Sequence, residues 1–207
     1  MTPQTIKDWW AIMQNLIKTK GSPDASKSSE IGATSVDQSL LGTNTGAMGM
    51  WWSNQLGAVS KASGQQMDLL RMPKLQGAAN GGMFLQPAMF YTASASSKHA
   101  AEADKFIDFM INDPEAGQII LSDRGLPASS KVLAAVKDKL PDADKKTLAF
   151  IDEVKGELAE TPAAPPKGAS AMEDILTRYS EEVMFGRMSP DEAAQKFIDE
   201  ANASIAG

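Results

Sequence analysis

The chain has 207 residues, 43% of them apolar, and a formal net charge of −6 at pH 7. This length suits one sizeable domain or two small lobes, and the acidic balance argues against a partner with a phosphate backbone, so we expect no nucleic-acid binding. Because the chain has no cysteine, disulfides, thiolate metal ligands and cysteine nucleophiles are excluded.

The first third of the chain opens with a predicted helix. Thr2 is a suitable N-cap, Pro3 fits the first helical position, and apolar residues then recur at helical spacing. Five elements are expected here: a helix over 2–19, a polar loop over 24–29, a short helix over 36–41, a strand over 46–52 and a helix over 53–60.

The remaining elements are mostly helical. They are a strand over 67–72, a loop over 74–82, a strand over 83–93, helices over 97–111 and from 113 to about 123, a helix over 142–158, a Pro-rich connection over 161–168, and helices over 171–184 and 190–204. The last two follow the capping boxes Ser170–Glu173 and Ser189–Glu192. Three short strands among about seven helices do not complete a sheet, so the sequence predicts the second half of an α/β protein.

Two adjacent tryptophans close the first predicted strand. Trp51 and Trp52 are followed by Ser53, Asn54 and Gln55. Because neighbouring side chains in a strand point to opposite faces, one indole can enter a core while the other is free. An aromatic platform beside amide groups is typical of a sugar site. The alternative is that both indoles are buried in a core or between lobes, as large aromatics usually are.

Four further residues are candidates for ligand contact. Gly81 and Gly82 permit close approach of a ligand to the backbone, although a plain turn explains them almost as well. Phe84 offers another ring or a core contact. Arg124 can donate two hydrogen bonds to neighbouring hydroxyls, or it can simply suit the end of a helix.

Several motifs occur in an order that resembles a known family. They are "TGAMGMWWSN" (45–54), "MPK" (72–74), Gly81-Gly82, "SSKHAAEADKFIDFMINDPEAGQ" (96–118) and "RGLPAS" (124–129). Together they resemble the C-terminal half of the extracellular solute-binding proteins of ABC importers, in the maltose-binding-protein-like group that binds sugars.

The resemblance implies an α/β fold. This is a partial periplasmic-binding-protein (type II) fold, with a helix-rich C-terminal lobe and a segment of the N-terminal lobe. Residues 1–73 would begin the C-terminal lobe, 74–127 would cross to the N-terminal lobe, and 128–207 would close the C-terminal lobe. The family carries a cleft-facing aromatic at the position of Trp51, so we expect Trp51 to contact sugar and Trp52 to pack, or both to line the cleft rim.

The implied function is that of a sugar-binding subunit that clasps a carbohydrate between two lobes and delivers it to the permease subunits in the membrane. The full-length protein would be periplasmic or a lipid-anchored extracellular protein. The residues show no signal peptide, which fits a cytosolic protein, a removed leader or a piece of a longer chain. Family members are about twice this length, so the resemblance implies a fragment. No cofactor, metal or catalytic residue is expected. The alternatives are a fragment of a glycan-processing enzyme and an interaction module that forms homodimers through the exposed half-cleft.

Overall fold

The computed structural model describes residues 2–32, 34–74, 76–78 and 81–206 of the chain. The ordered elements within these ranges are all helical: α1 Pro3–Lys18, α2 Ala25–Gly32, η1 Val36–Gln38, η2 Ser53–Gln55, α3 Leu56–Ser63, α4 Ala100–Asn112, α5 Pro114–Ile120, α6 Ser130–Val136, η3 Lys137–Lys139, α7 Asp142–Val154, η4 Lys155–Glu157, η5 Ala169–Ala171, α8 Met172–Met184 and α9 Pro190–Ala206. The chain divides into two compact units, which are Met1–Ser39 with Ala163–Gly207, and Leu40–Pro162.

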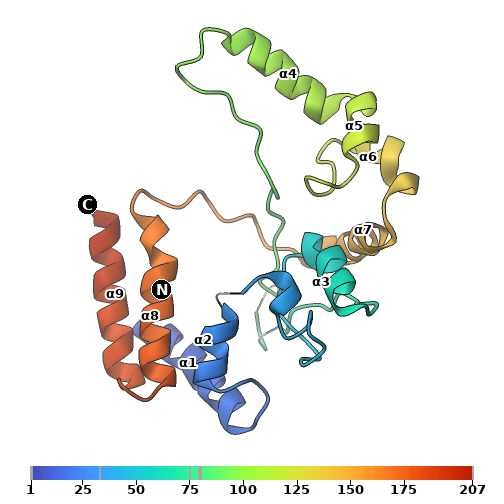
Figure 1. The fold of residues 1–207 in the computed structure, drawn as a ribbon. Helices are drawn as coiled ribbons and strands as arrows, with labels where there is room; N and C mark the ends of the chain where they lie inside the picture. Colours follow the sequence, from blue (N-terminus) through green and yellow to red (C-terminus); the bar gives the residue numbers. More distant parts are fainter. Residues whose placement is uncertain (1, 33, 75, 79–80, 207) are drawn as a thin grey trace. The chain divides into compact units, whose positions relative to one another are not determined.

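The first unit is a helical bundle of α1, α8 and α9. Helices α8 and α9 lie side by side, and α1 packs on both (Figure 1). Trp10 of α1 is fully buried at the centre, against Phe197 of α9 and Ile175 and Val183 of α8. Its indole Nε1 donates a hydrogen bond to the hydroxyl of Ser180 at 3.0 Å, so the buried polar atom has a partner.

Gly168 packs closely against the backbone at the end of α9. Its φ of +85° lies in the left-handed region, and a Cβ at this position would come within 1.9 Å of the carbonyl oxygen of Ser204. Only glycine fits such an approach without moving the backbone. The Pro-rich segment before it has no regular structure, as expected for 161–168.

The second unit contains α3 to α7 and the extended segments between them. Val132, Val136 and Leu140 form its main core cluster. Thr147 of α7 is buried, and its hydroxyl lies 3.1 Å from both the carbonyl of Ser53 and that of Ala143, so α7 is tied to η2.

The three predicted strands are wrong: residues 46–52, 67–72 and 83–93 are described and contain no strand. Their apolar, extended character suits a strand, but a strand also needs a neighbour to accept and donate backbone hydrogen bonds. In these three segments the structure gives one isolated bridge, which joins Phe84 to Ala159. Many of their side chains are therefore exposed, including Met48, Met50, Leu70 and Phe90.

Most predicted helices are confirmed, with small differences at their ends. Thr2 caps α1 through a hydrogen bond from the backbone N–H of Thr5, and Asp113 caps α5 through one from Glu115. The capping box at 170–173 is wrong, because Ser170 lies inside η5 and α8 has no side-chain cap.

The polar loop expected over 24–29 is also wrong, because this part of the chain begins helix α2. Asp24 explains the helix: its carboxylate accepts a hydrogen bond from the backbone N–H of Lys27 at 2.9 Å. Helix α6 was not predicted. Among the residues that the structure describes, no helix is both long and apolar enough to cross a membrane.

Candidate functional site

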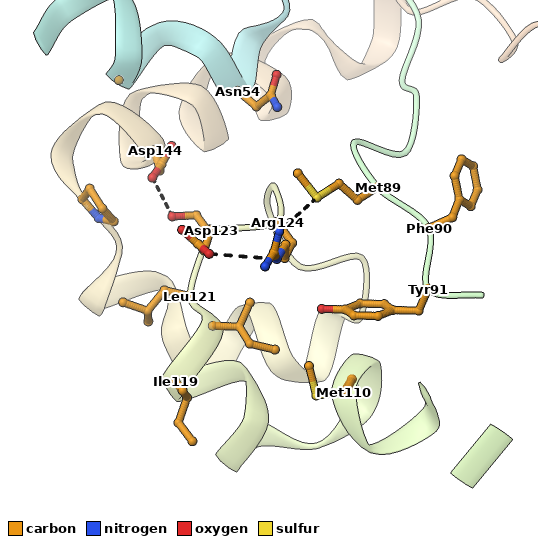
Figure 2. Close-up of a pocket in the computed structure, with 14 residues that line it drawn as sticks. Asn54, Met89, Phe90, Tyr91, Met110, Ile119, Leu121, Asp123, Arg124 and Asp144 are labelled. Atoms are coloured by element: carbon orange, nitrogen blue, oxygen red, sulfur yellow. Dashed lines mark hydrogen bonds and ion pairs between the residues drawn. The ribbon is translucent and has the colours of Figure 1, made fainter. Parts of the chain in front are cut away.

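A hollow of about 840 Å³ lies within the second unit and is the strongest candidate site (Figure 2). Its lining comes from the helical turn at η2 and α3, from the extended segment 89–91, from the ends of α4 and α5, from the turn 121–124 and from the start of α7. The volume lies in the range of about 300–1,000 Å³ that is common for small-molecule sites.

The turn after α5 supplies most of the polar groups. Ser122 donates a hydrogen bond to the carboxylate of Asp144 at 2.6 Å, and Asp123 lies 4.0 Å from the guanidinium of Arg124. Asn54, from η2, adds an exposed amide. The hollow thus holds two carboxylates and one guanidinium, a net charge of −1.

The turn also fixes the direction of these side chains. Leu121 ends α5 with a φ of +51°, and Gly125 has a φ of +90°. A Cβ on Gly125 would come within 2.7 Å of the Cβ of Ala88, so the turn lies close against the Ala88 side chain. A glycine at this place allows Arg124 to approach the segment 89–91.

The segment 89–91 is extended, so its side chains alternate in direction. Met89 and Tyr91 point toward Arg124, whereas Phe90 points away from it (Figure 2). Nη1 of Arg124 donates to the sulfur of Met89 at 3.8 Å, and both residues line the hollow. Tyr91 contributes an aromatic face and a hydroxyl to the same wall.

A smaller hollow of about 240 Å³ shares part of this wall. Seven residues, Arg124, Met89 and Tyr91 among them, line both hollows. The other nine residues of the smaller hollow have apolar side chains or none; Ile111, Leu126, Pro127 and Val132 are examples. Both hollows belong to the second unit.

Two of the seven predicted ligand contacts, Asn54 and Arg124, are brought together in the larger hollow. The tryptophans do not line it. Trp52 is 56% exposed and meets the ring of Phe84 edge-on, with ring centroids 5.9 Å apart. Trp51 is 38% exposed, and its Nε1 lies 2.7 Å from the place where a Cβ on Gly49 would be.

The two glycines lie apart from the hollow as well. Gly82 has a φ of +76°, which suits a turn, and a Cβ on Gly81 would lie 3.5 Å from the carbonyl oxygen of Met72, an ordinary contact.

Sequence reasoning missed Tyr91, Ser122, Asp123 and Asp144. Tyr91 is one of two tyrosines in the chain and stands in a predicted strand. Only its aromatic side chain could have marked it as a possible ligand contact. The sequence did not indicate that Asp123 and Asp144 share a site, because they are 21 positions apart. Acidic residues are also common on solvated helix faces. No cluster of three or more potential metal ligands occurs in the described part of the chain.

The sequence matches the model of one protein family over residues 2–148, and that family is described as bacterial extracellular solute-binding proteins. Similar solved structures include an extracellular solute-binding protein family 1 from Alicyclobacillus acidocaldarius, with 20% identity and a TM-score of 0.82. A periplasmic oligogalacturonide-binding protein from Yersinia enterocolitica has 17% identity and a TM-score of 0.77, and a de novo designed cysteine esterase has 16% and 0.79.

Each of these three likenesses covers 100% of this chain and 52% of the other chain. The chain therefore spans about half the length of these solved structures. The expected fold is confirmed in part, because the chain matches about half of each of these binding-protein structures. The described residues themselves form helices and irregular segments. The likeness to the designed esterase concerns the scaffold, since this chain has no cysteine.

Proposed function

The chain belongs to the family of bacterial extracellular solute-binding proteins, and on that premise we propose that it is the sugar-binding part of an ABC importer subunit. The observation that carries the proposal is the larger hollow, where Asn54, Arg124 and the Ser122–Asp144 pair surround a space bordered by Tyr91. Hydroxyls of a sugar need such donors and acceptors, and the apolar face of a pyranose ring suits an aromatic side chain.

The charge of the hollow favours an uncharged sugar. Asp123 and Asp144 face a single guanidinium, that of Arg124, and Asp123 already lies beside it. A carboxylate on the ligand would meet a net negative wall and be repelled. The Yersinia relative, at 17% identity, is named for binding oligogalacturonide, an acidic sugar. We propose that this chain differs from it and prefers neutral carbohydrate.

The aromatic residues outside the hollow are proposed as a second contact surface. Trp51, Trp52 and Phe84 present partly or largely exposed rings at one place in the second unit. Gly81 and Gly82 lie just before Phe84 in the chain. In the full-length protein these rings would face the ligand cleft, with Trp51 as the sugar platform. The lobes assigned to residues 1–73, 74–127 and 128–207 are part of the same proposal.

The partners follow from the same role. We propose that the full-length protein is periplasmic or lipid-anchored, and that it delivers its ligand to the permease subunits of the importer. The exposed apolar side chains of α4 and α5, such as Phe106 and Ile119, support the prediction that the isolated chain forms homodimers.

Binding without cleavage is favoured over glycan hydrolysis. Hydrolysis needs one carboxyl group to act as an acid and another as a base or nucleophile. Asp144 is engaged by Ser122, and Asp123 lies beside Arg124. Release of reducing ends from a glycan panel would revive the enzyme alternative.

Isothermal titration calorimetry of the 207-residue chain against neutral and acidic mono- to trisaccharides tests the proposal. We expect saturable binding of a neutral sugar, and loss of that binding in Arg124→Ala and Asn54→Ala. Arg187→Ala is the control, since Arg187 lies in the other unit, where it pairs with Glu182. No response to any sugar, or binding that both hollow variants retain, would contradict the proposed function.

A further inference from the structure

The smaller hollow differs from its larger neighbour in chemical character. The residues that line only the larger one include four with polar side chains: Asn54, Ser122, Asp123 and Asp144. The residues that line only the smaller one include none with a polar side chain. A ligand held by the polar groups would therefore have an apolar compartment directly beside it.

The boundary between the two compartments is formed by Arg124 and Met89. Both residues line both hollows, and they are joined by the contact between Nη1 and the sulfur at 3.8 Å. Arg124 also faces Asp123 on the polar side. On the far side, the wall is built from Gly125, which lies close to the Ala88 side chain, and from the buried side chain of Val132.

The smaller hollow has the right size for a ring. A cavity of about 150 Å³ lined by apolar side chains can hold a benzene molecule and stays dry when empty. The smaller hollow, at about 240 Å³, exceeds that volume. An unsubstituted sugar would leave this apolar surface in contact with water, whereas an apolar group attached to the sugar would cover it.

From this arrangement we propose that the natural ligand is a carbohydrate that carries an apolar substituent, an aryl or alkyl glycoside, whose sugar occupies the larger hollow and whose substituent occupies the smaller one. This inference rests on the proposed function, because it assigns the sugar to the larger hollow. It adds the chemical class of the ligand, which neither the family nor the sequence specifies.

Pairs of methyl and 4-nitrophenyl glycosides of the common neutral hexoses and pentoses, titrated by calorimetry into the 207-residue chain, test the proposal. We expect the 4-nitrophenyl member of the preferred pair to bind about tenfold tighter or more, because it buries additional apolar surface. Ala128→Leu and Ala128→Met fill the smaller hollow from an exposed position outside the larger one. Each is expected to remove most of the gain and to leave the affinity for the methyl glycoside unchanged.

Ala135→Leu is the matched control, since Ala135 is exposed on α6 and lines neither hollow. If methyl and 4-nitrophenyl glycosides bind equally, or if the gain survives both filling variants, the inference is wrong and the proposed function stands. If no glycoside binds, both are wrong. If free 4-nitrophenol binds in a manner that Ala128→Leu abolishes while sugars have no effect, the apolar site is supported and the sugar function is overturned.

Discussion

Ser122 and Asp144 join the turn after α5 to the first turn of α7 through a hydrogen bond of 2.6 Å. Both residues line the larger hollow, so the pair holds a carboxylate at its wall. Asp142 stands two residues earlier in the same helical turn, where its side chain is fully exposed and lies 3.9 Å from the ammonium group of Lys145. The two aspartates thus share the N-terminus of a helix but differ in their access to the hollow.

Asp144→Ala is expected to weaken binding of the preferred sugar about tenfold or more, since a hydrogen bond to a charged group contributes about 1.5–3 kcal/mol. Asp142→Ala is the control: it removes the same charge from the same end of α7 and should leave the affinity unchanged. Calorimetry of both variants measures the difference. An equal loss in the two variants would mean that the helix terminus, and not the hollow, is responsible.

Gly117→Ala is expected to destabilise the second unit. A Cβ at residue 117 would lie 2.2 Å from Cγ1 of Val132, where α5 meets the core of α6. Such overpacking of a core typically costs about 1–3 kcal/mol of unfolding free energy. Gly156→Ala is the matched control, because nothing lies within 4 Å of its Cβ position. Urea denaturation checks both, and an unchanged midpoint for Gly117→Ala would show that the helices separate easily.

Ser180→Ala tests the buried end of the first unit. The substitution leaves the indole Nε1 of fully buried Trp10 without its partner, which should cost about 1–3 kcal/mol. Ser26→Ala in α2 makes the same change at an exposed helical position and should be neutral or slightly stabilising. Tryptophan fluorescence during urea denaturation reports on both variants. A urea midpoint of Ser180→Ala equal to that of the unsubstituted chain would indicate that water accepts the hydrogen bond of the Trp10 indole instead.

The sequence predicted helices well because their signals are local. Thr2, Asp113 and Pro114 mark the starts of α1 and α5 within three residues of chain, and the structure has both helices there. The strands were predicted from local signals too, but a strand depends on a partner that the segment itself does not contain. Residues 46–52 and 67–72 have no partner strand in the described structure, so the strands predicted from their apolar pattern are wrong.

The candidate site was harder to predict, because it is assembled from distant segments. Arg124 and Asn54 were chosen for their chemistry, and the fold brings them into one hollow. Asp144 enters the same hollow only because α7 packs against the turn at Ser122, a tertiary contact that no spacing in the sequence reveals. Gly125 and Ala88 line the apolar compartment, and the sequence did not indicate that these two residues lie close together.

The acid stability of the first unit should depend on Glu200. Hydrogen bonds from Arg178 at 2.5 Å and from Tyr179 at 2.9 Å lower the pKa of its carboxyl group from the ordinary value. A lowered pKa in the folded state contributes stability that is present above the unfolded pKa and is lost as pH falls through the folded pKa. Urea denaturation between pH 2 and pH 6 should therefore show a loss at the acid end that Glu200→Gln reduces. Glu173→Gln, at an exposed position of α8, is the control for removing one carboxylate from the same unit, and a slope unaffected by Glu200→Gln would contradict the assignment.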